Sequence, residues 1–508
     1  MKKQISLVLC LCLLLTAFAG CSNNSNDTNK ETTQNNNTAD TETSSTADTT
    51  PEETEPSKYE ANIPAGTKYD GSTFTVVTYP NDGGIWGDVD WSATEYTGET
   101  LNDAVYARTA QVEDLLGVDI VTAYSTGASD QSLLATSVKS QDNAYQLYTL
   151  NVGSTFSSAQ NGNVQELNNF SEKGTLDLTA PWWDQNILKD MSVENMNFAL
   201  TGDIGTMYKK SIGAMMFNKV ILNQNQLESP YELMNSGKWT IDKMVEMGKT
   251  VSNDLDGNGV MDQSDQYGLI CFCDMMPLAM IGCDIQFFSK DADDVPQNTF
   301  YSEKAVSVLE KIGTLMYDTN ITYSWSRNGV TEDPAFKMFQ TDKSLFYYGE
   351  LHAVATMREM ESEFGIMPMP KFDENQEGYH HCVNPNVCAT YVIPSTNVDY
   401  EKTGYIMDAL GAASKNELTP AYFNTTLQGK VSRDAESQQS LEVIVDTIRY
   451  DIGYLGGLGF SSFLYTMADS GNTDLASAYA KQEKAINKQT ERMISKFADL
   501  KATLEAAG

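Results

Sequence analysis

Phe74-Thr75-Val76-Val77-Thr78-Tyr79 and Val118-Asp119-Ile120-Val121-Thr122-Ala123 are the two segments that decide the fold. Both are rich in β-branched and apolar residues, which favours strands. Between them, residues 101–116 carry apolar side chains at helical spacing, and Gly117 follows as a C-terminal cap. A strand, a helix and a second strand at this spacing predict a parallel α/β unit.

The same alternation continues along the chain. Thr240 is the expected N-cap of one further helix, and the final helix carries an interrupted apolar stripe that predicts packing on the protein body rather than a coiled coil. The expected helices are 132–140, 241–252, 304–317 and 474–507. The expected strands are 146–151, 214–218, 269–273, 343–348 and 389–394.

A series of short motifs follows one order from residue 69 to the C-terminus. They are Phe217-Asn218-Lys219, Gln226-Leu227-Glu228-Ser229-Pro230 followed by Trp239-Thr240, Phe339 with Lys343 and Leu345-Phe346, Gly365-Ile366-Met367-Pro368-Met369-Pro370, and Val392-Ile393-Pro394. In this order they resemble motifs of the family 1 extracellular solute-binding proteins, which include maltose-type receptors. The sequence departs from that pattern at Asp342, Ser344 and Ile241-Asp242.

The resemblance implies a two-lobed α/β fold of the periplasmic-binding-protein type (type II), with ligand held in the cleft between the lobes. By analogy, the first lobe takes residues 69–205 and 371–430, and the second takes 206–370 and 431–508. It also implies a receptor, not an enzyme, that passes a small molecule, favoured to be an oligosaccharide, to the permease subunits of an ABC importer.

The N-terminus is typical of a bacterial lipoprotein. Lys2 and Lys3 precede an apolar run that ends in Phe18-Ala19-Gly20-Cys21, which predicts a signal peptide over residues 1–20 and lipidation of Cys21. Residues 21–68 are mostly Ser, Thr, Asn, Asp and Glu up to about Lys58, too polar to bury a core, and are predicted to form a disordered tether. The expected location is the outer face of the cell membrane, held by the lipid anchor.

The acidic composition excludes one class of partner. The chain has 34 Lys and Arg against 69 Asp and Glu, a net charge of −35. Removal of residues 1–20 takes away two lysines and no acid, so the mature protein carries −37. Such a charge repels phosphate backbones, and a nucleic-acid partner is not expected.

Five cysteines remain after Cys21, an odd number that leaves at least one thiol free within the chain. Cys271 and Cys273 lie in an apolar segment and are expected to be buried thiols. Cys382 and Cys388 flank an Asn-Pro-Asn turn and are candidates for one local disulfide. The spacings match no common zinc pattern.

Residues 254–265 match the twelve-residue calcium loop. Oxygen-bearing side chains recur at alternate positions, and Gly259 occupies the position of the sharp turn. The alternative is a turn rich in Asp and Asn that binds nothing. The predicted ligands of a structural Ca²⁺ ion are Asp254, Asp256, Asn258, Asp262 and Asp265 by side chain and Val260 by its carbonyl.

Candidate ligand-binding residues follow the predicted strands, since ligands of parallel α/β sheets bind beyond the carboxyl ends of the strands. The loop after the first strand holds Trp86, Asp90 and Trp91, and indole faces with carboxylates suit sugar rings and hydroxyls. The alternative is that either Trp fills the core. The family alignment adds Lys210, Ser211, Glu350 and His352, although His352 is also suited to cap a helix.

Two other functions stay open at this point. A surface glycan hydrolase needs only a pair of carboxylates, which an acidic chain offers by chance, although no motif of a serine hydrolase, zinc protease or nucleotide-binding loop is present. A glycan-binding sensor or adhesin without transport is the third reading.

Overall fold

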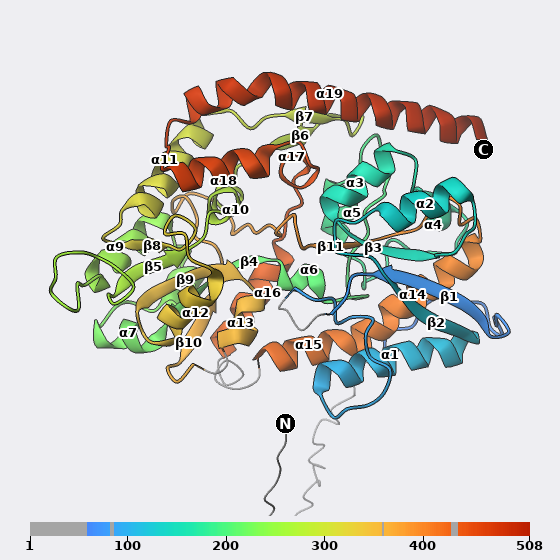
Figure 1. Ribbon diagram of the computed structural model, residues 1–508, viewed down its shortest axis with the longest axis horizontal. Helices are drawn as coiled ribbons and strands as arrows, with labels where there is room; N and C mark the ends of the chain where they lie inside the picture. Colours follow the sequence, from blue (N-terminus) through green and yellow to red (C-terminus); the bar gives the residue numbers. More distant parts are fainter. Residues whose placement is uncertain (1–57, 82–85, 358–359, 428–434, 508) are drawn as a thin grey trace, which may run out of the picture. The chain divides into compact units, whose positions relative to one another are not determined.

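The computed structural model describes residues 58–81, 86–357, 360–427 and 435–507. Residues Ser57–Gly508 form one compact unit of mixed helices and strands (Figure 1). Within the described ranges, no helix is long and apolar enough to cross a membrane. The predicted signal peptide, Cys21 and nearly all of the tether lie outside the described residues. The lobe boundaries stay a prediction, because this unit is not divided further.

The first sheet has four strands in the order β11-β3-β1-β2. β1 pairs in parallel with both β2 and β3, and β11 runs antiparallel to β3. The parallel pairing confirms the α/β unit predicted from the first two strands. The strands are β1 Ser72–Thr78, β2 Val118–Tyr124, β3 Leu147–Asn151 and β11 Ala389–Val392.

The second sheet has five strands in the order β10-β4-β9-β5-β8. β5 is parallel to both β8 and β9, whereas β4 runs antiparallel to β9 and β10. The carboxyl ends of β5, β8 and β9 therefore lie at one edge of this sheet. The strands are β4 Gly213–Asn218, β5 Tyr267–Cys271, β8 Thr322–Ser324, β9 Ser344–Glu350 and β10 Phe364–Met367.

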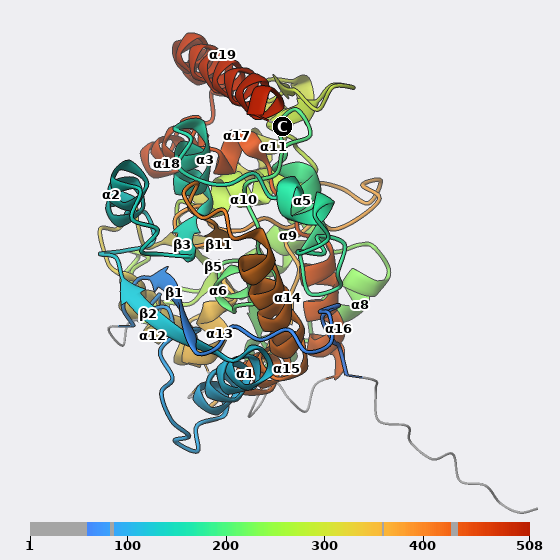
Figure 2. The ribbon, with the colours of Figure 1, turned by 90° about the vertical axis from the view of Figure 1, so that its right-hand side faces the viewer.

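Helices cover both sheets, and Figure 2 shows α14 next to α1 and α15, against which it packs. A separate hairpin is formed by β6 Phe288–Lys290 and β7 Pro296–Asn298. The helices up to β5 are α1 Thr100–Leu116, α2 Ser132–Ser140, α3 Val152–Gln160, α4 Asn168–Glu172, α5 Gln185–Asp190, α6 Met207–Lys210, α7 Lys219–Gln224, α8 Pro230–Asn235 and α9 Ile241–Val251. The later helices are α10 Met275–Gly282, α11 Glu303–Tyr317, α12 Glu332–Gln340, α13 His352–Thr356, α14 Tyr400–Asn416, α15 Leu418–Leu427, α16 Ala435–Asp446, α17 Ile452–Leu455, α18 Phe460–Ser470 and α19 Leu475–Ala507.

The helices and strands predicted from the sequence are confirmed to within a few residues at each end. Gly117 has φ 62°, the left-handed conformation that ends α1. The side chain of Thr240 accepts a hydrogen bond from the Lys243 backbone amide, as expected of an N-cap. Local signals were sufficient here because capping and apolar spacing act within each segment.

All five described cysteines are free and buried. The buried state of Cys271 and Cys273 was expected, but the candidate disulfide between Cys382 and Cys388 is not formed. Cys382 lies near Asp451 and Cys388 near Ser211, and burial raises the pKa of both thiols, which keeps them protonated.

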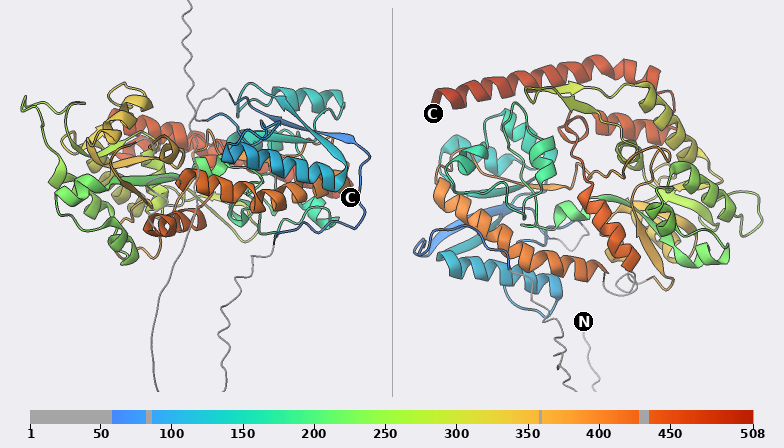
Figure 3. Two further views of the ribbon diagram at one scale, coloured as in Figure 1. Left: turned by 90° about the horizontal axis from the view of Figure 1, so that it is seen from below. Right: turned by 180° about the vertical axis from the view of Figure 1, so that it is seen from behind.

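The C-terminal helix α19 connects elements from both halves of the unit. Near its start Tyr479 packs on Phe300, with ring centroids 5.4 Å apart, beside the β6–β7 hairpin. Near its end Phe497 packs on Phe156 of α3 at 5.8 Å and on Phe198 at 5.6 Å. Figures 1 and 3 show the helix spanning this distance in red. The predicted packing of its apolar stripe on the protein body is confirmed.

We expect Phe497→Ala to lower the free energy of unfolding by about 3–5 kcal/mol, because the ring is buried among aromatic neighbours and its loss leaves a cavity. Denaturant unfolding measures this loss. The matched control on the same helix is Lys501→Ala, which removes a partly exposed ion pair with Glu194 and should change stability by less than about 1 kcal/mol. Equal losses in both variants would contradict a packing role for Phe497.

Candidate functional site

A cavity of about 270 Å³ lies at the carboxyl ends of β5, β8 and β9. Phe272 and Asp274 follow β5, Trp325 follows β8, and Glu350 ends β9. Because these strands are parallel neighbours, side chains far apart in sequence meet at one edge. Its complete lining is Trp86, Phe272, Asp274, Trp325, Glu332, Tyr347, Tyr348, Gly349, Glu350, Asn384, Asn386 and Val387.

The opposite wall comes from segments that belong with the first sheet. Trp86 lies in the loop after β1, and residues 384–387 lie just before β11. Trp86 reaches across to the second sheet and contacts His352 of α13, with ring centroids 4.1 Å apart. The cavity is therefore a cleft between the parts of the chain built on the two sheets.

Two aromatic side chains stack in this cleft, so each ring covers one face of the other, and the outer faces of the pair are called the Phe272–Trp325 surface below. The rings of Phe272 and Trp325 stack with centroids 4.0 Å apart and an angle of 11° between their planes. Both residues are only partly buried, and both line the cavity. Flat aromatic faces of this kind bind the C–H faces of sugar rings or the charge of a cation.

Asn384 connects two carboxyl groups at the base of the cleft. Its side-chain amide donates to Oε1 of Glu350 at 2.7 Å and to Oδ2 of Asp274 at 3.3 Å. Burial raises the pKa of Asp274 well above its usual value, and the charge and hydrogen bond of Glu350 raise it further. Two carboxylates held by one amide repel each other, which favours the protonated form of Asp274.

Three buried polar atoms in the lining have no hydrogen-bond partner among the described residues. They are Oδ1 of Asp274, the hydroxyl of Tyr348 and Nε1 of Trp325. Asp274 is 2% exposed and Tyr348 is 1% exposed, so water does not satisfy them at the protein surface. Unpaired buried groups are costly, and these three are suited to be satisfied by a polar ligand.

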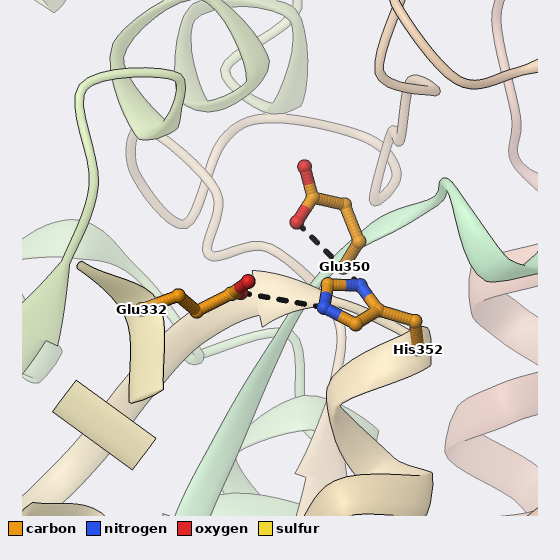
Figure 4. A group of neighbouring side chains, drawn as sticks. All are labelled: Glu332, Glu350 and His352. Atoms are coloured by element: carbon orange, nitrogen blue, oxygen red, sulfur yellow. Dashed lines mark ion pairs between the residues drawn. The ribbon is translucent and has the colours of Figure 1, made fainter. Parts of the chain in front are cut away.

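His352 lies between two carboxylates (Figure 4). Its Nε2 is 3.3 Å from Glu332, and its Nδ1 is 3.9 Å from Glu350. These are ion-pair distances, although neither nitrogen makes a hydrogen bond of good geometry. The three side chains are close enough to be considered as a metal site. However, each nitrogen faces a different carboxylate, so the groups do not converge on one ion as metal ligands do.

Of the predicted ligand-binding residues, Trp86 and Glu350 line the cleft, and His352 lies against Trp86. The structure does not bring the other four there. Asp90 accepts hydrogen bonds from the backbone amide and hydroxyl of Thr206, at 2.7 and 2.8 Å. Trp91 is 6% exposed and packs on the guanidinium of Arg108 and the ring of Tyr391.

Lys210 and Ser211 lie at the end of α6, outside the lining of the cleft. Ser211 is fully buried and donates to the carbonyl of Tyr208, while its own carbonyl accepts from the Asn384 amide at 2.8 Å. Ser211 therefore positions a cleft residue through its backbone. The ligand-binding role of these residues is not tested by the geometry alone.

Sequence reasoning did not select Phe272, Asp274, Trp325 or Asn384 as ligand-binding residues. A signal was present, because Phe272, Asp274 and Trp325 directly follow predicted or observed parallel strands. Asn384 follows no strand end, and only the tertiary path of residues 371–388 brings it to the cleft.

A larger cavity of about 720 Å³ lies where residues 378–380 and 446–452 pass between α5 and α10. Two of its cations are already paired, with Arg449 2.6 Å from Asp284 and Lys290 2.9 Å from Asp294. It also lacks a pair of stacked aromatic rings. The smaller cleft, where unpartnered polar atoms and partly buried aromatic rings meet, is therefore the candidate ligand site.

The predicted calcium loop folds as a compact turn. Asp254 accepts the backbone amides of Gly257 and Gly259, each at 2.7 Å, and the amide of Gly259 lowers the pKa of that carboxyl. Carboxylate oxygens of Asp254, Asp256 and Asp265 lie within 4.8 Å of one another, whereas Asp262 is not part of this group. Three hard oxygen ligands around one point fit a calcium ion.

Solved structures with a similar fold are solute-binding proteins. An ABC substrate-binding protein from Listeria monocytogenes in complex with cycloalternan is 11% identical, with a TM-score of 0.55, over 83% of this chain and 100% of the other. A cyclo/maltodextrin-binding protein in complex with maltotetraose is 13% identical, with a TM-score of 0.54, over 84% and 98%. UgpB from Mycobacterium tuberculosis, in complex with glycerophosphocholine, is 12% identical, with a TM-score of 0.54, over 85% and 100%.

This chain has the two-lobed α/β fold of ABC solute-binding proteins. The fold implied by the family 1 motifs is thus confirmed. No protein-family model and no curated protein matches the chain. At 11–13% identity the similarity establishes the fold, while the three neighbours hold different ligands. The ligand of this chain must therefore be argued from its own cleft.

Proposed function

We propose that this protein is the solute-binding receptor of an ABC importer and that it binds a saccharide in the cleft between the two sheets. The observation that carries the proposal is the combination, in one cavity, of the stacked Phe272–Trp325 surface and three buried polar atoms without partners. Sugars present both an apolar C–H face and many hydroxyl groups, so they match both features. The sugar complexes of similar folds support this ligand class.

Binding without turnover is favoured over glycoside hydrolysis. A glycosidase places two carboxyl groups about 5–9.5 Å apart on either side of the scissile bond. Here Asp274 and Glu350 share one amide, that of Asn384, and lie side by side on the second sheet. These two carboxyl groups therefore act on a ligand from one side, whereas a glycosidase needs its acid and base on either side of the bond.

We expect at least one member of a saccharide panel to give a saturable thermal shift. Trp325→Ala should lower the affinity for that saccharide by at least about tenfold, or about 1.4 kcal/mol of binding free energy. The reason is loss of the ring face and of the unpartnered Nε1 donor. Calorimetry measures the affinity.

The matched control is Trp91→Ala. Trp91 is packed within the first sheet's core, so its loss should lower stability by about 3–5 kcal/mol and leave the affinity of the folded protein close to normal. A response to peptides with none to any saccharide would refute the saccharide assignment.

We further propose that the loop 254–265 binds a structural calcium ion. Millimolar Ca²⁺ should then raise the midpoint of thermal unfolding by about 2–5 °C relative to protein in chelator, because binding to the folded state alone is stabilising. Asp256→Ala should abolish this response, while the exposed Asp114→Ala on α1 should keep it. Equal midpoints with and without calcium in the unmutated protein would show that the loop is only a turn.

Anchoring through Cys21 completes the proposal, because an importer receptor outside a cell must stay near its permease. Labelled fatty acid should enter the full-length protein, and Cys21→Ser should remove the label and release the protein from the membrane fraction. A Cys21→Ser protein that keeps its label and its membrane association would rule out this anchor.

A further inference from the structure

Apart from the tyrosine hydroxyls, the ionisable side chains that line the cleft are all carboxylic acids. Asp274, Glu332 and Glu350 are in the lining, and none of the described lining residues is a Lys or an Arg. His352 is within ion-pair distance of Glu332 at 3.3 Å and can offset one charge. The Asp274–Glu350 pair is approached only by the other nitrogen of the same imidazole, Nδ1, which lies 3.9 Å from Glu350. Among the described residues, the donor that links the two carboxyl groups is the neutral amide of Asn384.

The groups that face Asp274 from the surrounding elements leave its charge unbalanced. Glu350 and Glu332 are acids, and the hydroxyls of Tyr348 and Tyr465 are neutral. The raised pKa of Asp274 and its contact with Glu350 favour one proton held within the pair, which leaves the pair one negative charge while no ligand is bound. A buried carboxylate without a counter-charge is costly, and a cation that entered beside it would remove that cost.

The walls of the cleft also suit a cation. Trp86, Phe272, Trp325, Tyr347 and Tyr348 all contribute to the lining. Aromatic faces attract a positive charge placed within about 6 Å of the ring centroid, and the attraction is strongest where water is excluded. Carboxyl groups at the base and aromatic rings on the walls are together the features expected of a site for an ammonium group.

We propose that the ligand is an amino sugar whose protonated amine binds at the Asp274–Glu350 pair, with its ring against the Phe272–Trp325 surface. This inference rests on the proposed function, since it takes the ligand to be a saccharide. The unpartnered Oδ1 of Asp274 accepts from the ammonium group, and the Tyr348 hydroxyl and Trp325 Nε1 remain available to the sugar hydroxyls.

Binding of an ammonium group changes the number of protons held by the carboxyl pair. Before binding, one proton is shared by the two carboxyl groups. The ammonium group brings a positive charge that stabilises both carboxylates, so the shared proton leaves for the solvent and the ammonium group keeps all of its own protons. Binding of a neutral sugar supplies no such charge and releases no proton.

The test uses three matched β-1,4-linked oligosaccharides that differ in one substituent. These are oligomers of glucosamine, which carry a cationic amine, of N-acetylglucosamine, which carry a neutral amide, and of glucose, which carry a hydroxyl. We expect the glucosamine oligomer to bind at least about tenfold more tightly than the other two. Calorimetry in buffers of different ionisation enthalpy should detect proton release of up to one per site with the amine only.

Variants of the carboxyl pair make the test specific. Asp274→Asn and Glu350→Gln should each bring the three affinities to within about twofold and abolish proton release. Asp114→Asn removes the same charge from the exposed surface of α1 and should keep both the preference and the release. Two variants of the pair are used so that a folding defect in one does not decide the outcome.

The outcomes separate this inference from the proposed function. Tighter binding of the neutral oligomers, or a preference for the amine that survives both pair variants, would overturn the amino-sugar inference and leave saccharide binding intact. Binding of choline or putrescine with no response to any saccharide would overturn the saccharide function itself. No detectable binding of any of these probes would overturn both the amino-sugar inference and the saccharide function.

Discussion

The parallel pairing of β5 with β8 and β9 is the constraint on which the binding cleft depends. Parallel neighbours end at the same edge of a sheet, so Phe272, Trp325 and Glu350 converge although nearly 80 residues separate the first from the last. An antiparallel arrangement would send alternate strand ends to opposite edges. The stacked rings and the carboxyl pair would then not share a cavity.

The second requirement is that elements of the first sheet close over this edge. Trp86 does so by contact with His352, and the segment before β11 does so through Asn384. The long helix α19 adds contacts on both sides through Tyr479 and Phe497. The cleft is therefore built from side chains of both parts and is held by packing at several separate places, which favours a preformed site.

The polar groups of the cleft indicate the ligand class, because similar proteins with this fold bind different ligands. Asp274 is the central group. It is nearly inaccessible, it shares Asn384 with Glu350, and it retains one oxygen without a partner. A buried acid in this state has no evident structural use, and it constrains the charge and hydrogen-bonding capacity of whatever occupies the cavity.

The sequence by itself determined the α/β class, the bounds of several helices and strands and the turn at residues 254–265, because periodicity, caps and glycine turns act within a few residues. It also selected Trp86, in the loop after β1, and Glu350, at the end of β9. Only the tertiary structure decided that Trp91 and Asp90 pack in the first sheet's core, although the same loop composition favoured both for ligand binding. Only the tertiary structure paired Asp274 with Glu350 through Asn384. Burial and long-range contacts depend on how distant strands are ordered in a sheet, and no local pattern encodes that order.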